Sequence, residues 1–305
     1  MQPRPASAAS ALLCAAAVLS LCAGVVACQP TAPVPRNVLL ITVVTLRADH
    51  LGTYGYARDT SPVVDELARR GVVFENAWVQ WPKTVPSMAS MFSATYPQEN
   101  GVVVVTGGNW VPDRLVMLPE VLRERGFRTA AVVPNAGLGQ ESNFPQGFES
   151  LRELWMEHDG APRPAPLVTD AVLEELERLA AQPDRFFLWV HYIDPHDPYS
   201  PPAEYAEPFL GDELYRSRSV PFNAGDNPHG GIGENLARQH GDRDDVAWYV
   251  AQYDGEIRYL DEHLGRLLEG LERSGVAGET LVALTADHGE GLGERDYYFH
   301  HGHLP

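Results

Sequence analysis

Asp287 and His288 are the residues of this sequence whose types and spacing most directly suggest chemistry. They stand side by side directly after an apolar run, in "TADHGEGLGE", and Gly289 lets the backbone there approach a ligand closely. A carboxylate next to an imidazole is half of a site for Zn²⁺ or a similar divalent ion. The sequence therefore predicts that Asp287 and His288 are metal ligands; a hydrogen-bonded Asp–His turn without a metal is the alternative.

Two further segments place histidines at or just after the ends of apolar runs. "HYIDPHDPY" contains a polar cluster of His191, Asp194, His196 and Asp197, and "YYFHHGHLP" contains His300, His301 and His303. His191 still belongs to its apolar run, so its side chain can also point into the core. Asp194 and His196 lie past the end of that run and are candidates for substrate or metal binding. A solvated run of histidines would explain one such segment but hardly all of them.

Thr84 directly follows Lys83, which is the only lysine of the chain, at the expected start of a helix. A hydroxyl at a helix N-terminus meets free backbone N–H groups and the positive end of the helix dipole, which stabilise an alkoxide and can hold an anionic ester. Metal coordination is another way to activate such a weak nucleophile. Thr84 is therefore either a nucleophile or an ordinary helix cap. Lys83 either adds positive charge or is incidental.

The elements that must position these groups alternate between apolar strands and amphipathic helices. This alternation predicts an α/β fold whose mostly parallel sheet is covered by helices on both faces. Ligands bind beyond the carboxyl ends of the strands in such sheets, where Asn135 also falls. A long loop is expected over 200–241. The expected strands are 37–44, 127–134, 185–194 and 280–289. The expected helices are 61–71 with Ser61 as N-cap, 85–97, 118–126, 167–182 and 244–274, the last with a stripe of leucines at 260, 264, 267, 268 and 271.

The N-terminal segment has the composition of an export signal. The apolar run "ALLCAAAVLSLCAGVV" ends in "VVAC", which resembles the lipobox of bacterial lipoproteins. Residues 1–27 are therefore expected to be a lipoprotein signal peptide, Cys28 to carry the lipid and 28–36 to form a Pro-rich tether. A secretory peptide cut nearby is the alternative. The mature protein would then be exported to the cell envelope and held at a membrane through Cys28.

The overall charge limits the partners. A net charge of −18 argues against nucleic acid as a partner. A protein this acidic would need local cations or a metal ion to bind an anionic ester.

Several motifs occur in the order seen in one family, among them "NVLLITVVTLRADHLGTYGY", "TVPSMASMFSATYP", "WVHYIDPHDPY" and "YDGEIRYLDEHLGRLL". Over about residues 36–305 the chain resembles the sulfatase family of the alkaline phosphatase superfamily. The resemblance implies metal-dependent hydrolysis or transfer of sulfate or phosphate esters through a covalent intermediate. It implies Thr84 as the nucleophile and, with Asp287 and His288, as a metal ligand. It also implies that His196 and His301 hold the ester oxygens.

The chain departs from the family pattern in three places. Thr84 stands where sulfatases have Cys or Ser, so the formylglycine of true sulfatases cannot form, and Met88 replaces the arginine of that motif. Val44 occupies the place of a metal-binding acid, and Asp49 is too far along to replace it. Relatives continue beyond residue 305, so the catalytic domain over 37–305 is expected to be C-terminally incomplete.

Three functional interpretations follow from these departures. The first is a sulfatase-family hydrolase of impaired activity that binds one divalent ion (Ca, Zn or Mn) weakly. The second is a non-catalytic pseudoenzyme that keeps the fold, and the third is a phosphoryl-group transferase acting on envelope lipids or glycans. Further candidates for contact with substrate or a second metal are Lys83, Asn135, His191 and Asp194.

Overall fold

The computed structural model describes residues 34–103, 110–155, 164–211, 214–215, 218–222 and 230–301. The expected signal segment, Cys28 and His303 lie outside these residues, so their assignments remain predictions. Residues 35–305 form one compact unit. Within the described ranges, no helix has both the length and the apolar character needed to cross a membrane.

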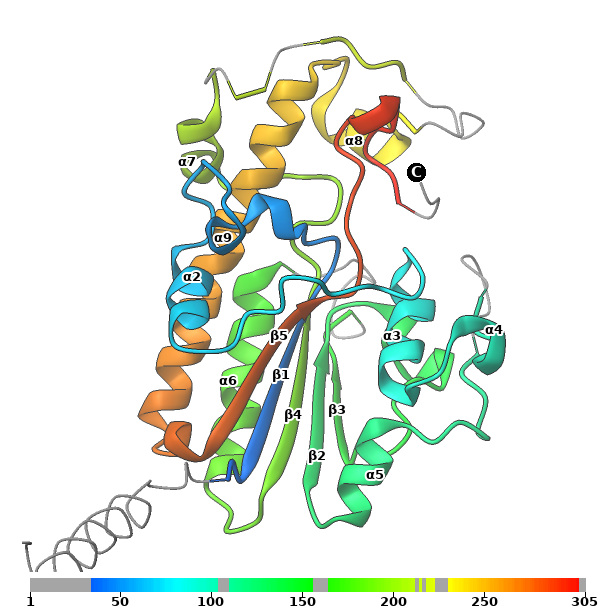
Figure 1. Ribbon diagram of the computed structural model, residues 1–305, viewed down its shortest axis with the longest axis vertical. Coiled ribbons are helices and arrows are strands. Elements are labelled where there is room, and N and C mark those ends of the chain that lie inside the picture. The colour runs from blue at the N-terminus through cyan, green and yellow to red at the C-terminus, as the bar shows by residue number, and fades with distance from the viewer. Residues whose placement is uncertain are drawn as a thin grey trace, which may run out of the picture. The chain divides into compact units, whose positions relative to one another are not determined.

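The centre of the unit is a five-stranded sheet of order β3-β2-β4-β1-β5, in which every pair is parallel (Figure 1). The strands are β1 (Asn37–Val43), β2 (Arg128–Val133), β3 (Ser150–Glu153), β4 (Phe186–Tyr192) and β5 (Thr280–Ala286). β4 is buried along its whole length, which explains its continuous apolar sequence. The predicted parallel α/β fold is confirmed. The edge strand β3 was missed because "SLRE" is short, polar and only half-buried.

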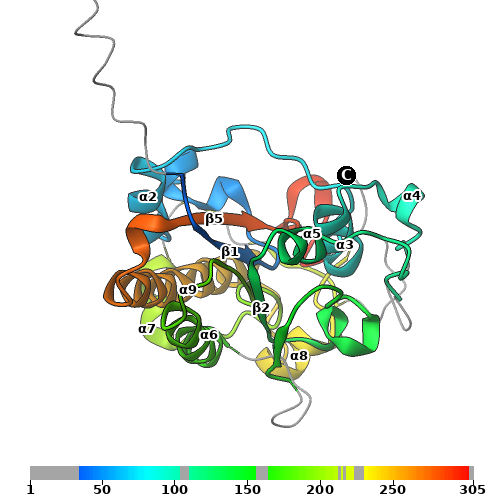
Figure 2. The same ribbon diagram turned by 90° about the horizontal axis from the view of Figure 1, so that it is seen from below.

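Alternate strand residues face two separate cores, as the two-residue period of a strand requires. Leu188 and Val190 of β4 pack in a cluster with α6 (Ala165–Ala180) and α9 (Val246–Arg273). Phe187 and Trp189 pack in another with α3 (Thr84–Ser93) and residues around α5 (Leu118–Glu124). Figure 2 shows α6 and α9 on one side of the sheet and α3 and α5 on the other. The remaining helices are α2 (Pro62–Arg69), α4 (Pro97–Asn100), α7 (Ala203–Ala206) and α8 (Glu234–His240).

The longest helix, α9, carries both an apolar stripe and buried polar side chains. Its predicted leucine stripe is buried at Leu260, Leu264, Leu267 and Leu271, whereas Leu268 is only half-buried. The buried Asp261 accepts the backbone N–H groups of Val63 and Val64, each at 2.9 Å, at the start of α2. Ser61 occupies the expected N-cap position of α2, but its side chain makes no cap bond, and a carboxylate from α9 takes that role.

The predicted loop over 200–241 is also partly wrong. It contains α7, a 3₁₀ turn at Glu207–Phe209 and α8. These elements are too short to show helical periodicity among the Pro and Gly residues of this stretch. Gly255 of α9 lies so close to α7 that an added Cβ would be 2.9 Å from Cα of Ala206. The short helix α7 therefore packs closely against α9.

Candidate active site

The strand order brings the polar residues together. Because β1 lies between β4 and β5 in a parallel sheet, the carboxyl ends of all three strands meet at one edge. Asp287 and His288 follow β5, Val44 follows β1, and Asp194 and His196 follow β4. The first residue of α3, Thr84, is within hydrogen-bonding distance of His288.

Asp287 is fully buried and held from three sides. Its Oδ1 accepts the backbone N–H of Thr45 at 3.1 Å and that of His288 at 2.7 Å. Its backbone carbonyl accepts the hydroxyl of Ser87, on α3, at 2.5 Å. Its other carboxylate oxygen, Oδ2, has no hydrogen-bond partner within the described part of the chain. Asp287 therefore presents one free, buried anionic oxygen at the edge of the sheet.

His288 lies between Asp287 and Thr84. Its Nδ1 is 2.9 Å from the carbonyl oxygen of Gly289, an acceptor, so Nδ1 carries the proton and Nε2 keeps a lone pair. Nε2 is 3.3 Å from Oγ1 of Thr84 and 3.5 Å from Oδ2 of Asp287. This lone pair can accept the hydroxyl proton of Thr84 or bind a metal ion.

His301 and His196 continue this row of imidazoles. The ring centroids of His288 and His301 are 4.5 Å apart, and those of His301 and His196 are 5.2 Å apart. Burial alone would lower the pKa of His196, but the hydrogen bond and charge of Asp197, at 2.7 Å, outweigh it and raise this pKa to about 9. Burial and neighbouring basic side chains, His288 foremost, lower the pKa of His301 to about 2. The row thus ends in an imidazolium.

Lys83 directly precedes the nucleophile candidate, and Asn135 lies just after the end of β2. Lys83 occupies the N-cap position of α3, and burial lowers its pKa although Glu290 and Asp197 act in the opposite direction. The ammonium forms no ion pair with any residue that the structure describes. Asn135 Oδ1 is buried without a hydrogen-bond partner among those same residues.

His191 and Asp194 lie deeper in the protein. His191 is completely buried with Nδ1 2.7 Å from the hydroxyl of Thr42, and burial lowers its pKa to about 4. His191 is therefore a neutral histidine of the core, which is one of the two possibilities that the sequence allowed. Asp194 is buried beside Glu256 of α9, and burial raises the pKa of both carboxyls.

A metal ion would find three donors at this edge of the sheet. No group of three or more His, Cys, Asp or Glu side chains in the described ranges is arranged to hold a metal. Val44, which is fully buried at the end of β1, contributes no charge. The unpartnered Oδ2 of Asp287 and the Nε2 lone pair of His288 nevertheless fit one divalent ion, with the Thr84 hydroxyl as third donor.

Sequence reasoning missed the residues that support these groups. Glu290 is buried, with both carboxylate oxygens 3.4 Å from Nδ1 of His301, although it belongs to the "DHGEG" stretch that pointed to Asp287. Asp197 was noticed only as part of a polar cluster, and Thr45 not at all. The one signal that could have revealed such a partner is that Asp197 directly follows His196 in the sequence.

Comparison with known proteins identifies the family. The sulfatase family model matches residues 36–304. Human iduronate 2-sulfatase is 28% identical over 310 residues, covering 85% of this chain and 55% of that protein. The ulvan-active sulfatase of Formosa agariphila is 26% identical over 292 residues, covering 88% and 52%. The chain thus spans about half the length of these relatives.

A solved structure supports the same fold. Phosphonate monoester hydrolase of Agrobacterium radiobacter superposes with a TM-score of 0.63 at 22% identity, covering 88% of this chain and 64% of that chain. Members of the matched family generally use a divalent metal ion. The family match over nearly the whole described unit, together with this fold, shows that the chain belongs to the sulfatase family.

Proposed function

We propose that the protein is a hydrolase of anionic sulfate or phosphate esters that acts through a covalent intermediate on Thr84. The observation that carries the proposal is the position of the Thr84 hydroxyl, at the first residue of α3 and 3.3 Å from Nε2 of His288. The N-terminal end of α3 favours negative charge there. The sequence relatives include sulfatases, and one similar solved structure is a phosphonate monoester hydrolase. Both support an anionic ester as substrate.

The residues of the site suit a two-step displacement. Oγ1 of Thr84 would release its proton to solvent and form a bond to sulfur or phosphorus while the bond to the leaving oxygen breaks. The imidazolium of His196 would donate a proton or a hydrogen bond to that oxygen, and His301 would contact a neighbouring oxygen. Water would then hydrolyse the ester on Thr84. No formylglycine takes part, because residue 84 is threonine.

A divalent ion (Ca, Zn or Mn) held by Thr84, Asp287 and His288 would supply Lewis-acid chemistry and help to deprotonate the hydroxyl. The buried Val44 leaves that set with a single carboxylate, so we expect weak binding and low activity. Loss of a residue that only orients a ligand typically costs roughly 10–100-fold in affinity or activity, and loss of a ligand should cost more. The same observation favours the second candidate, a non-catalytic member that keeps the fold.

Restoring the carboxylate tests the proposal. Hydrolysis of p-nitrophenyl phosphate, bis-p-nitrophenyl phosphate and p-nitrophenyl sulfate should be very low in the wild type. Activity should rise in Val44→Asp with added Mn²⁺ or Zn²⁺, stay low in Val44→Asn, which lacks the charge, and vanish in Val44→Asp/Thr84→Ala. Strong wild-type activity that survives Thr84→Ala would contradict both the nucleophile and the impaired site. A Val44→Asp variant that binds metal but never turns over would favour the non-catalytic candidate.

We further propose export to the cell envelope and a lipid anchor on Cys28, supported by the "VVAC" sequence alone. Labelled fatty acid should enter the wild type and not Cys28→Ala. A wild type that takes up no label and has its N-terminus elsewhere would refute the anchor.

A further inference from the structure

The backbone directly after β1 adopts an unusual conformation beside the candidate site. Thr45 has φ of 54°, in the left-handed region that a β-branched residue rarely occupies. Its side-chain oxygen is buried without a hydrogen-bond partner among the described residues, so the side chain does not stabilise this conformation. Other contacts must therefore hold the turn in place.

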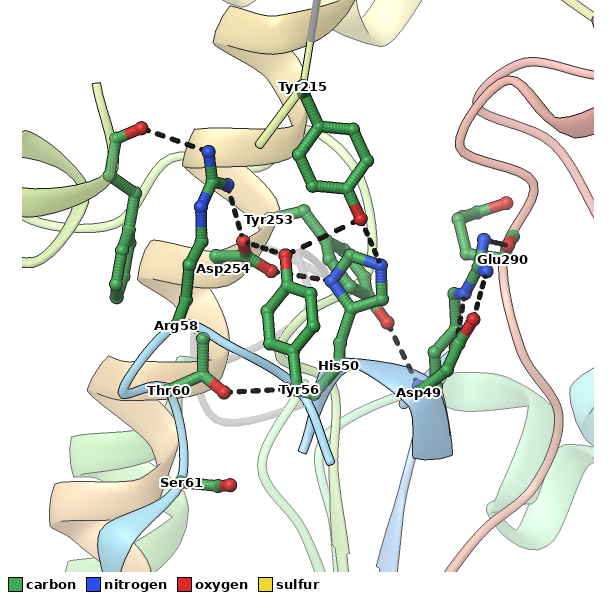
Figure 3. A network of polar contacts seen from close by, with 12 residues as sticks. Asp49, His50, Tyr56, Arg58, Thr60, Ser61, Tyr215, Tyr253, Asp254 and Glu290 are labelled. Carbon is green, nitrogen blue, oxygen red and sulfur yellow. Dashed lines mark hydrogen bonds and ion pairs between the residues drawn. The ribbon is translucent and has the colours of Figure 1, made fainter. Parts of the chain in front are cut away.

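The hydroxyl of Tyr253 provides those contacts. Tyr253 is fully buried and lies next to Asp254 on α9, facing the segment that carries Asp49 and His50 (Figure 3). Its hydroxyl donates to the carbonyl oxygen of Thr45 at 2.7 Å and accepts the backbone N–H of Arg47 at 3.0 Å. One side-chain oxygen thus bonds the backbone on both sides of residue 46 and fixes the path of the turn.

This turn determines which oxygen of Asp287 stays free. With the backbone in this path, the N–H of Thr45 donates to Oδ1 of Asp287, which also accepts the N–H of His288. Both donors therefore engage the same oxygen, and Oδ2 keeps its lone pairs. Since residue 44 is an apolar valine, Oδ2 is the anionic oxygen that the junction of β1 and β5 offers to a ligand.

We propose that Tyr253 is a positioning residue: its hydroxyl holds the turn at Thr45 so that Oδ1 of Asp287 is occupied and Oδ2 points free to a cation. The inference rests on the proposed function, because it gives Oδ2 of Asp287 a ligand to bind. The hydroxyl of Tyr253 forms no hydrogen bond with Thr84 or Asp287 in the described structure, and it acts through the backbone of residues 45–47.

The same helix offers a matched control one turn away. Tyr249 is also a fully buried residue of α9, and its hydroxyl also donates to a backbone carbonyl, that of Arg243 at 3.1 Å. Arg243 lies outside the candidate site. Tyr249→Phe and Tyr253→Phe each remove one hydroxyl from the same helix, but only the second removes contacts to the turn at Thr45.

Amide hydrogen exchange, read by mass spectrometry on peptides that contain residues 44–48 and 286–290, tests the positioning without requiring activity. In Tyr253→Phe we expect exchange at these peptides to accelerate about tenfold beyond the change in global stability, as loss of one or two hydrogen bonds implies. In Tyr249→Phe it should stay within about twofold of the wild type. Equal acceleration in both variants, or none in Tyr253→Phe, would overturn the inference.

Binding of Mn²⁺ alone, followed by titration calorimetry, tests the consequence for the site. Tyr253→Phe should weaken Mn²⁺ binding about tenfold or more, as is typical when the support of a ligand is lost, and Tyr249→Phe should not. Unchanged affinity in Tyr253→Phe would overturn the link to Oδ2. Absence of Mn²⁺ binding in the wild type would instead count against the proposed metal-dependent function, while the exchange result would still decide whether Tyr253 holds the turn.

Discussion

Two buried polar clusters flank the segment that follows β1, and they differ in how completely their atoms are paired. The Asp254 cluster consists of Asp254, His50, Tyr56, Arg58 and Tyr215 (Figure 3). One oxygen of Asp254 accepts from Nδ1 of His50 at 2.6 Å, and the other accepts from Tyr56 and Arg58, each at 2.6 Å. The remaining nitrogen of the imidazole is 3.2 Å from the hydroxyl of Tyr215. Both carboxylate oxygens and both ring nitrogens of this cluster are thus paired.

The candidate site, on the other side of that segment, is incompletely paired. Among the buried atoms without hydrogen-bond partners in the described part of the chain, four lie at or near neighbouring strand ends: Thr45 Oγ1, Asn135 Oδ1, His191 Nε2 and Asp287 Oδ2. Others, among them Trp81 Nε1 and Trp155 Nε1, lie in loops. Each such atom costs about 1–3 kcal/mol of stability, so each needs an explanation. The contrast indicates that the Asp254 cluster serves stability, and it supports the proposal that the unpaired oxygen of Asp287 belongs to a binding site.

The largest effect is expected from breaking the paired cluster. Asp254→Ala would remove the buried carboxylate that His50, Tyr56 and Arg58 all contact, and we expect the free energy of unfolding to fall by about 3–5 kcal/mol. Urea denaturation measures this directly. Asp170→Ala is the control, because Asp170 forms an exposed ion pair with Arg266 that should contribute at most about 1 kcal/mol. Similar losses in both variants would remove the distinction between the cluster and the surface.

A smaller, pH-dependent effect is expected from the one strongly paired imidazole of the site. The folded-state pKa of His196 is raised to about 9, above its ordinary value of 6.5. The stabilisation is therefore fully present below about pH 6.5 and is lost as the pH rises through about 9, by about 1–3 kcal/mol. Unfolding free energies at several pH values should show this decline in the wild type. The decline should be absent in His196→Gln; its persistence there would assign it to another group.

Removing a single neutral contact from the paired cluster should have a modest effect. Tyr215→Phe deletes the hydroxyl that lies 3.2 Å from Nε2 of His50, together with its long contact of 3.5 Å to the hydroxyl of Tyr56, and leaves the contacts of Asp254 intact. We expect a loss of about 0.5–1.5 kcal/mol, the usual net contribution of one hydrogen bond. The same urea series measures it. A loss as large as that of Asp254→Ala would mean that the cluster depends on the tyrosine rather than on the carboxylate.

The smallest effect on stability is expected at the unpaired carboxylate itself. In Asp287→Asn the amide oxygen can still accept both backbone N–H groups at Oδ1, and the amide nitrogen faces the lone pair of His288. We expect the free energy of unfolding to change by less than about 1 kcal/mol while Mn²⁺ binding is lost. Thermal or urea unfolding with and without Mn²⁺ checks both the small change in stability and the loss of Mn²⁺ binding. A large loss of stability in the absence of metal would show that Asp287 is a structural residue.

Local sequence patterns were sufficient for most of the fold. Continuous apolar runs identified β1, β4 and β5, although only β4 is buried along its whole length and the edge strand β5 is half-buried. The leucine stripe identified α9 because it packs into the core beside the sheet. Strand ends followed by Asp287, His288 and His196 indicated the edge at which a site forms. These features are encoded by neighbours along the chain, since burial and periodicity act over a few residues.

By itself, then, the sequence determined the fold class, the main elements and the candidate residues of the site. Only the tertiary structure decided the order of the strands, the capping of α2 by Asp261, the pairing of Asp254 with His50 and the hold of Tyr253 on Thr45. The physical reason is distance along the chain: Tyr253 and Thr45 are separated by 208 residues. Contacts of that kind arise only when the packed sheet and α9 bring the two segments together, and no local periodicity encodes them.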